Sequence, residues 1–231
     1  MPRAHRCATV KAMLLAAGRG ERMRPLTDTT PKPLLEVAGR PLIVWHLAAL
    51  ARAGIREVII NLSWLGAQLR AALGDGRDLG VSISWSEEGA VPLETGGGIF
   101  HALPLLGPEP FLVVNSDIWT DIDFGRLHLS AAAHASLVLI ANPTHHPRGD
   151  FGLEGDLVVN RESERLTYSG VGVYSPEFFA GCTGGRFPLL PLLNRAIAAG
   201  RVHGQVHHGQ WCDVGTPERL ATLSARLTAL K

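Results

Sequence analysis

The sequence has few cysteines, and they stand far apart. Cys7, Cys182 and Cys212 are the three in 231 residues, and none belongs to a C-x-x-C pair. This spacing indicates neither a disulfide framework nor a zinc knuckle, and it favours a reducing compartment.

A large excess of positive or negative charge is also lacking, as are long apolar runs. The formal net charge is +1, so the whole-chain charge gives no reason to expect nucleic acid or a membrane as a partner. The run AMLLAA is too short to span a bilayer, and it leads into a glycine loop instead of a cleavage site. We expect a cytoplasmic protein with a loose tail over residues 1–8 and small-molecule partners; the sequence does not indicate its oligomeric state.

What is present is an alternation of strand-like and helix-like segments. Strands are predicted at 10–17, 57–62, 81–85, 111–117 and 135–142, and helices at 42–54, 64–76 and 97–106. This order predicts an α/β fold with a sheet rich in parallel strands and helices on both faces. Beyond about residue 143 the pattern changes to short strands and turns. A helix near 189–200, a strand at 201–208 and a last helix started by Thr216 and Pro217 follow.

Unusual residues gather where the predicted strands end. Residues 18–24 and 115–117 each follow a strand, and ligands of parallel α/β sheets bind at the carboxyl ends of strands. Gly18 and Gly20 allow the backbone to approach phosphate oxygens closely, Arg22 adds a planar cationic fork, and Lys32 stands between two prolines. These residues together indicate a polyphosphate pocket. The pattern is neither a Walker loop nor a dinucleotide fingerprint; the plainer alternative is a glycine turn with surface arginines.

The stretch LAAGRGERMRPLTDTTPKPLLEVAGRP resembles the signature of the sugar-1-phosphate nucleotidyltransferases. PLETGGGIF, FLVVNSDIWTD, SGVGVYSP and WCDVGTPERL resemble further family segments, in the same order. The resemblance implies a Rossmann-like three-layer sandwich with a mostly parallel mixed sheet and a small antiparallel sugar-binding subregion. Because the chain has no linker-like segment and no repeat, we expect one domain over residues 1–231, with no C-terminal β-helix. The resemblance also implies transfer of a nucleotidyl group from a nucleoside triphosphate to a sugar 1-phosphate, with release of pyrophosphate.

The resemblance also implies roles for individual residues. Arg22 and Lys32 would be catalytic, and Mg²⁺ would bind Asp117 and Asp213. The nucleotide would contact Ala17, Gly18, Gly20, Glu21, Arg22, Lys32, Thr95 and Gly96, and the sugar phosphate would contact Asn115, Asp150 and Asn160. Alternatives from the residues alone are a turn cap for Asp117, support of the last helix for Asp213, and a turn former for Asp150.

The chain departs from the family pattern at two positions near the site. The loop Glu94–Gly98 lacks the glutamine that precedes it in many uridylyl and thymidylyl members, and Ser116 replaces a usual glycine.

LETGGGI and NPTHHPRGDFGL resemble members that use UTP and N-acetylmuramate 1-phosphate in peptidoglycan recycling. GTP with mannose 1-phosphate is the alternative pair. A regulator that binds nucleotide sugars without catalysis is another alternative, although Arg22, Lys32, Asp117 and Asp213 are all present. We expect the paired histidines 145–146 and 207–208 to be rim residues and not metal ligands.

Overall fold

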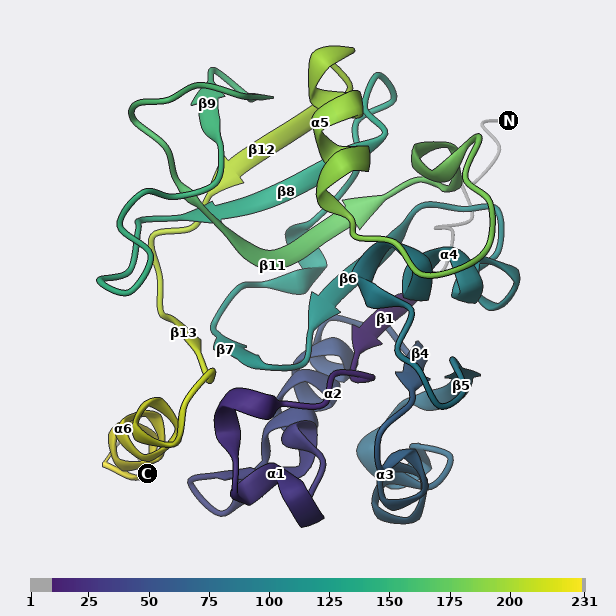
Figure 1. Ribbon diagram of the computed structural model, residues 1–231, viewed down its shortest axis with the longest axis vertical. Coiled ribbons are helices and arrows are strands. Elements are labelled where there is room, and N and C mark those ends of the chain that lie inside the picture. Colours follow the sequence, from purple (N-terminus) through teal and green to yellow (C-terminus); the bar gives the residue numbers. More distant parts are fainter. Residues whose placement is uncertain (1–9, 230–231) are drawn as a thin grey trace, which may run out of the picture.

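The computed structural model describes residues 10–229, so the tail predicted for residues 1–8 lies outside the described residues (Figure 1). A nine-stranded sheet has the order β5-β4-β1-β6-β11-β8-β12-β10-β9, in which β11 and β10 run against the other strands. Its strands are β1 (Ala12–Leu15), β4 (Glu57–Leu62), β5 (Ser82–Glu87), β6 (Phe111–Asn115), β8 (Ala135–Ile140), β9 (Gly152–Glu154), β10 (Leu157–Val159), β11 (Thr167–Tyr174) and β12 (Val202–Val206).

Within residues 10–229, two small sheets, six α-helices and five short 3₁₀ helices complete the architecture. The small sheets pair β2 (Glu36–Val37) with β3 (Arg40–Pro41), and β7 (Ile118–Thr120) with β13 (Trp211–Asp213). The helices are α1 (Leu26–Thr29), α2 (Leu42–Arg52), α3 (Gly66–Leu73), α4 (Glu94–Leu106), α5 (Leu190–Ala198) and α6 (Pro217–Thr228). Within residues 10–229, none of these helices combines the length and apolarity that a bilayer span requires.

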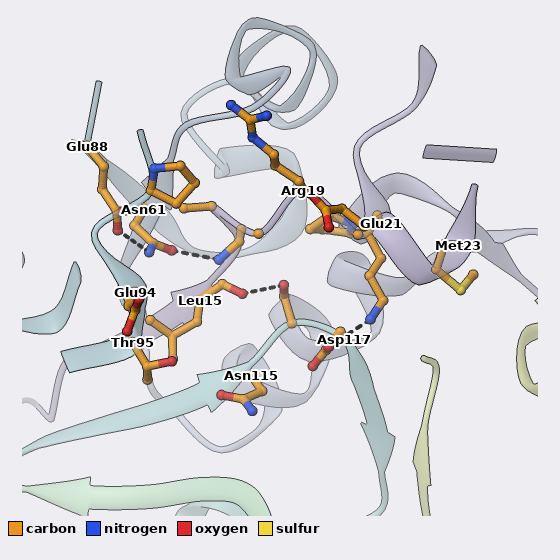
Figure 2. A pocket seen from close by; sticks show the side chains of 18 of the residues that line it. Leu15, Arg19, Glu21, Met23, Asn61, Glu88, Glu94, Thr95, Asn115 and Asp117 are labelled. Atoms are coloured by element: carbon orange, nitrogen blue, oxygen red, sulfur yellow. Dashed lines mark hydrogen bonds and ion pairs between the residues drawn. The ribbon is translucent and has the colours of Figure 1, made fainter. Parts of the chain in front are cut away.

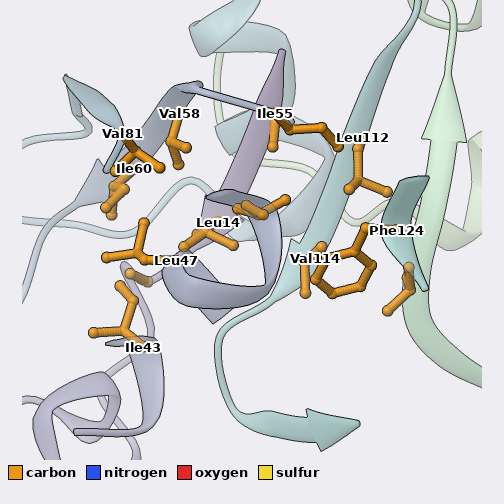
Figure 3. Packing of buried hydrophobic residues seen from close by; sticks show 14 of the residues in the cluster. Leu14, Ile43, Leu47, Ile55, Val58, Ile60, Val81, Leu112, Val114 and Phe124 are labelled. Carbon is orange, nitrogen blue, oxygen red and sulfur yellow. The ribbon is translucent and has the colours of Figure 1, made fainter. Parts of the chain in front are cut away.

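The two faces of the sheet bury separate clusters, as the alternation of side chains along a strand requires. Leu14 of β1 packs with Leu47 of α2 and Leu69 of α3 on one face (Figure 3). Met13, the preceding residue, packs on the other face with the cluster that includes α4 and α5. The expected three layers of helix, sheet and helix are therefore confirmed.

The predicted elements are present, with shifted ends. Helix α4 begins at Glu94, three residues before the predicted start, so the glycines of its first turn belong to the helix. Helix α6 begins at Pro217, and the side chain of Thr216 accepts a hydrogen bond from the Arg219 N–H, as an N-cap does. The antiparallel subregion is also confirmed: β11 runs against β6 and β8, and β10 runs against β9 and β12.

Candidate active site

The glycine loop after β1 lines a cavity of about 670 Å³. Gly20 has a φ of 63°, and a Cβ there would lie 2.9 Å from Cγ2 of Thr27. Thr27 is fixed in turn, because its hydroxyl donates a 2.8 Å hydrogen bond to the carbonyl of Gly20. Only glycine fits this tight turn without strain.

Gly18 differs from Gly20, because a Cβ at this position would meet nothing within 4 Å. The open space beside it is the cavity, which Gly18 lines together with Ala17, Gly20, Glu21 and Arg22. All five residues of this loop that the sequence assigned to the nucleotide therefore lie at one cavity wall, and Figure 2 shows how Arg19 and Glu21 extend from it.

Lys32 and Asp117 meet inside the same cavity. The ammonium of Lys32, a residue that is 8% exposed, donates a 2.7 Å hydrogen bond to Oδ2 of Asp117. Asp117 follows β6, whose carboxyl end lies beside that of β1. A lysine ammonium carries three donors, so two remain for phosphate oxygens.

Two hydrogen bonds, one of them fully buried, fix the segment that carries Asp117. Ser116, which stands where the family usually has glycine, donates from its hydroxyl to the carbonyl of Leu15 at 2.5 Å. On the far side, Nε2–H of buried His46 donates to the carbonyl of Ile118 at 2.7 Å. Burial lowers the pKa of His46 to about 4, so this imidazole is neutral at physiological pH.

Asp213 reaches the neighbourhood of Asp117 through the small sheet. It is paired with Ile118, and the adjacent Val214 N–H donates to the carbonyl of Asp117 at 2.9 Å. Its Oδ2 accepts a 2.6 Å hydrogen bond from Nη1 of Arg219, and Nε2 of His145 lies 3.4 Å from the same oxygen. Asp117 and Gly215 line the cavity, whereas Asp213 is outside its lining.

The chemistry of these two aspartates fits a hard divalent cation. Carboxylate oxygens are the ligands that Mg²⁺ prefers, and such an ion usually completes its shell with water and substrate phosphates. Among the described residues, no group of three or more His, Cys, Asp or Glu side chains is arranged to hold a metal without such help. The two carboxylates would therefore supply part of a shell, with the rest coming from the substrate.

Thr95 lines the cavity, but Gly96 is buried behind it. A Cβ at Gly96 would lie 2.7 Å from the Phe187 ring, and one at Gly97 would overlap the carbonyl of Gly185. The glycines of this turn thus allow close approach of the protein's own segment 185–187. That segment is held by hydrogen bonds from Phe187 N–H to Leu93 O at 3.1 Å and from Gly97 N–H to Phe187 O at 3.0 Å.

Asn61 and Glu88 also line the cavity, and sequence reasoning missed both. Oδ1 of Asn61 accepts from the Ala16 N–H at 2.6 Å, and its Nδ2 donates to Oε1 of Glu88 at 2.6 Å. Oε2 of Glu88 accepts from the Leu93 N–H at 2.7 Å. Figure 2 shows the first two of these hydrogen bonds. The available signal was position: Asn61 lies at the carboxyl end of β4 and Glu88 directly follows β5.

A second cavity of about 330 Å³ adjoins the first and shares Leu15, Thr95 and Asn115 with it. Asp150 lies in its wall, where Oδ2 accepts from the Tyr168 N–H at 2.8 Å and Oδ1 lies 3.0 Å from Nε2 of His146. Asn160 does not line either cavity; its side-chain amide donates to Asn194 of α5.

Comparison with known proteins identifies the family. The family model described as nucleotidyl transferase matches residues 11–162. The N-acetylmuramate alpha-1-phosphate uridylyltransferase of Neisseria meningitidis serogroup B is 54% identical over 96% of this chain and 100% of its own length. The enzyme of the same name from Caulobacter vibrioides is 39% identical over 94% of this chain and 96% of its own. A solved Bacillus anthracis structure, in complex with a sucrose, has the same fold, with a TM-score of 0.84, 18% identity and 96% of each chain covered. By this match, this chain belongs to the nucleotidyl transferase family.

Proposed function

We propose that the protein transfers a uridylyl group from UTP to N-acetyl-α-D-muramate 1-phosphate and releases pyrophosphate. The observation that carries the proposal is the junction of two cavities at Thr95 and Asn115, next to a phosphate-type glycine loop and a Lys32–Asp117 pair. The first cavity would hold the nucleotide and the second the sugar. The identity to the Neisseria uridylyltransferase over its full length supports this pair of substrates.

In the proposed reaction a phosphate oxygen of the sugar 1-phosphate attacks the α-phosphorus of UTP. The bond from that phosphorus to the bridging oxygen breaks, and the electron pair leaves with pyrophosphate. Little covalent work falls to the protein in such a displacement, so positioning and charge stabilisation dominate.

The chain offers a residue for each of these tasks. Arg22, exposed in the cavity wall, is suited to hold the departing pyrophosphate through its planar fork. Lys32 would contact the phosphates that react, and Asn115, in the walls of both cavities, would contact the sugar phosphate. Asp150 presents acceptors for sugar hydroxyls in the second cavity.

Asp117 and Asp213 would hold a divalent cation, most simply Mg²⁺. Such an ion neutralises charge on the phosphate oxygens. Asp117 would be available once Lys32 turns to phosphate, and Asp213 would remain oriented by Arg219.

Pyrophosphate release tests the proposal. The full-length protein is assayed with Mg²⁺ against four nucleoside triphosphates combined with several sugar 1-phosphates, including N-acetylmuramate 1-phosphate and mannose 1-phosphate. We expect selective release with UTP and the muramate sugar. Release with GTP and mannose 1-phosphate would replace the substrates but keep the mechanism, whereas no release with any pair would favour a nucleotide-sugar-binding regulator.

A further inference from the structure

The second cavity has an unusual balance of charge for the substrate proposed for it. Its lining is largely apolar, with Phe151, Pro188, Leu190 and Leu193 among its members. Asp150 is its one charged residue within the described part of the chain. No lysine or arginine lines it there, although the proposed sugar carries a carboxylate on its lactyl ether as well as a phosphate.

A substrate carboxylate in this cavity would face an unfavourable environment without a cation. Asp150 would repel it, and the apolar wall would remove its water without replacing the lost hydrogen bonds. Arg165 lines neither cavity, and its guanidinium donates to the backbone carbonyl of Asp150. His146 is occupied by the Asp150 carboxylate itself.

Among the described residues, four cations line the adjoining first cavity, and three belong to its proposed phosphate side. Arg19 and Arg22 lie on the glycine loop, with Arg19 over the ring of Trp64, and Lys32 is bound to Asp117. The fourth, Arg186, comes from the segment that continues into Pro188 and Leu189 of the second cavity.

Local structure places Arg186 near Thr95, one of the residues that the two cavities share. The two hydrogen bonds of Phe187 attach its segment to the first turn of α4. Thr95 of that turn lines both cavities. The neighbouring Glu94 has a φ of 61°, a left-handed conformation that residues other than glycine adopt at a cost and that clusters at ligand sites.

Arg186 already holds a carboxylate. Its Nη2 lies 2.9 Å from Oε1 of Glu94, while 62% of the Arg186 side chain and 36% of the Glu94 side chain remain exposed. Exposed ion pairs of this kind contribute little to stability, so another carboxylate can replace Glu94 at small cost. The guanidinium fork matches a carboxylate in geometry as well as in charge.

We propose that Arg186 is the specificity residue for the carboxylate of the sugar, and that Glu94 occupies this position until the sugar binds. The assignment rests on the proposed function, because it takes the muramate sugar as the substrate. It explains how a cavity without a lysine or arginine in its described lining accepts a sugar with a second anionic group.

The test compares two ligands that differ only in this group. N-acetylmuramate 1-phosphate and its lactyl carboxamide analogue are each measured with wild type, Arg186→Gln and Arg186→Lys, by KM in pyrophosphate release and by calorimetric binding. Arg186→Gln should weaken the carboxylate sugar by about tenfold or more, the scale of one charge-assisted contact, and should leave the carboxamide within about twofold. Arg186→Lys should recover part of the preference, because it restores charge without the fork.

Two further variants serve as controls. Arg77→Gln removes an equally charged, exposed arginine outside both cavity linings, and should change neither ligand. Glu94→Gln removes the internal competitor, and should strengthen binding of the carboxylate sugar relative to the carboxamide.

The possible contrary results are distinguishable. Equal weakening of both ligands by Arg186→Gln would mean that Arg186 only supports the α4 turn, and no weakening would place the carboxylate elsewhere; either result overturns the assignment. If wild type does not bind or use the muramate sugar but is active with another pair, the proposed substrate fails, and the role of Arg186 fails with it.

Discussion

Gly18 and Gly20 are two residues apart in one loop, yet the structure gives them different reasons to be glycine. Alanine at Gly20 would adopt a left-handed conformation, which costs about 1–2 kcal/mol for a residue with a Cβ. It would also press on Thr27, whose hydrogen bond to Gly20 prevents free rotation and is worth about 1 kcal/mol. Gly20→Ala should therefore destabilise the protein by about 2–3 kcal/mol.

Gly18→Ala should leave the stability of the protein nearly unchanged but weaken nucleotide binding. A Cβ at Gly18 meets nothing within 4 Å and the backbone is not left-handed, so stability should stay within about 0.5 kcal/mol of wild type. The new methyl group would project into the space that the nucleotide phosphates are proposed to fill. Nucleotide affinity should fall by about tenfold or more, which corresponds to about 1.4 kcal/mol.

Thermal denaturation and calorimetric titration with UTP and Mg²⁺ measure the two effects separately. Gly20→Ala should lower Tm by about 4–12 °C, since each kcal/mol corresponds to about 2–4 °C for a chain of this size. Normal UTP affinity in Gly18→Ala would refute the placement of phosphates at this loop. Wild-type stability in Gly20→Ala would refute the conformational argument.

Four other substitutions address the remaining parts of the site. Asp117→Asn should leave the fold intact and lower Mg²⁺-dependent pyrophosphate release by about 100-fold, and near-normal turnover would contradict the metal role. Arg22→Lys should lower kcat/KM by about tenfold or more because a point charge replaces a fork; a wild-type value would refute that reasoning. The buried His46 has its pKa lowered from 6.5 to about 4, so the unfolded state binds more protons between these values and stability falls as pH drops. Wild type should lose about 2 kcal/mol more than His46→Gln between about pH 8 and pH 5 in urea unfolding, and parallel curves would disprove this. Ser116→Ala should lower the free energy of unfolding by about 1 kcal/mol in the same assay, because it removes the hydrogen bond to Leu15. An unchanged unfolding midpoint would show that this hydrogen bond contributes nothing to stability.

Sequence reasoning predicted the part of the fold that local pattern determines. The buried runs of β1, β4 and β6 and the broad apolar face of α2 are visible in the chain itself. Because these strands are parallel, their carboxyl ends share an edge, and the position of the glycine loop beside Asn115 and Asp117 followed from that rule.

Contacts between segments that are distant in the sequence could not be predicted from local pattern. The pairing of β13 with β7 brings Asp213 close to Asp117, and His145, from the loop after β8, meets Arg219 at the Asp213 carboxylate. We expected Gly96, in the glycine-rich turn after Glu94, to contact the nucleotide. The structure shows that segment 185–187 packs against this turn, and no feature near residue 95 indicates a partner that far along the chain.

Three ion pairs lie in or beside the site: Lys32 with Asp117, Arg219 with Asp213, and Arg186 with Glu94. Each pair keeps its part of the site close to neutral before substrate binds. In the proposed reaction, phosphate would replace Asp117 on Lys32, and the sugar carboxylate would replace Glu94 on Arg186, while a divalent cation would bind Asp117. Because no charge is left buried and unpaired during such an exchange, the site avoids the large desolvation cost of an isolated charge. Both members of the Lys32–Asp117 and Arg186–Glu94 pairs line the first cavity, so each side chain reaches an internal partner and the space proposed for substrate.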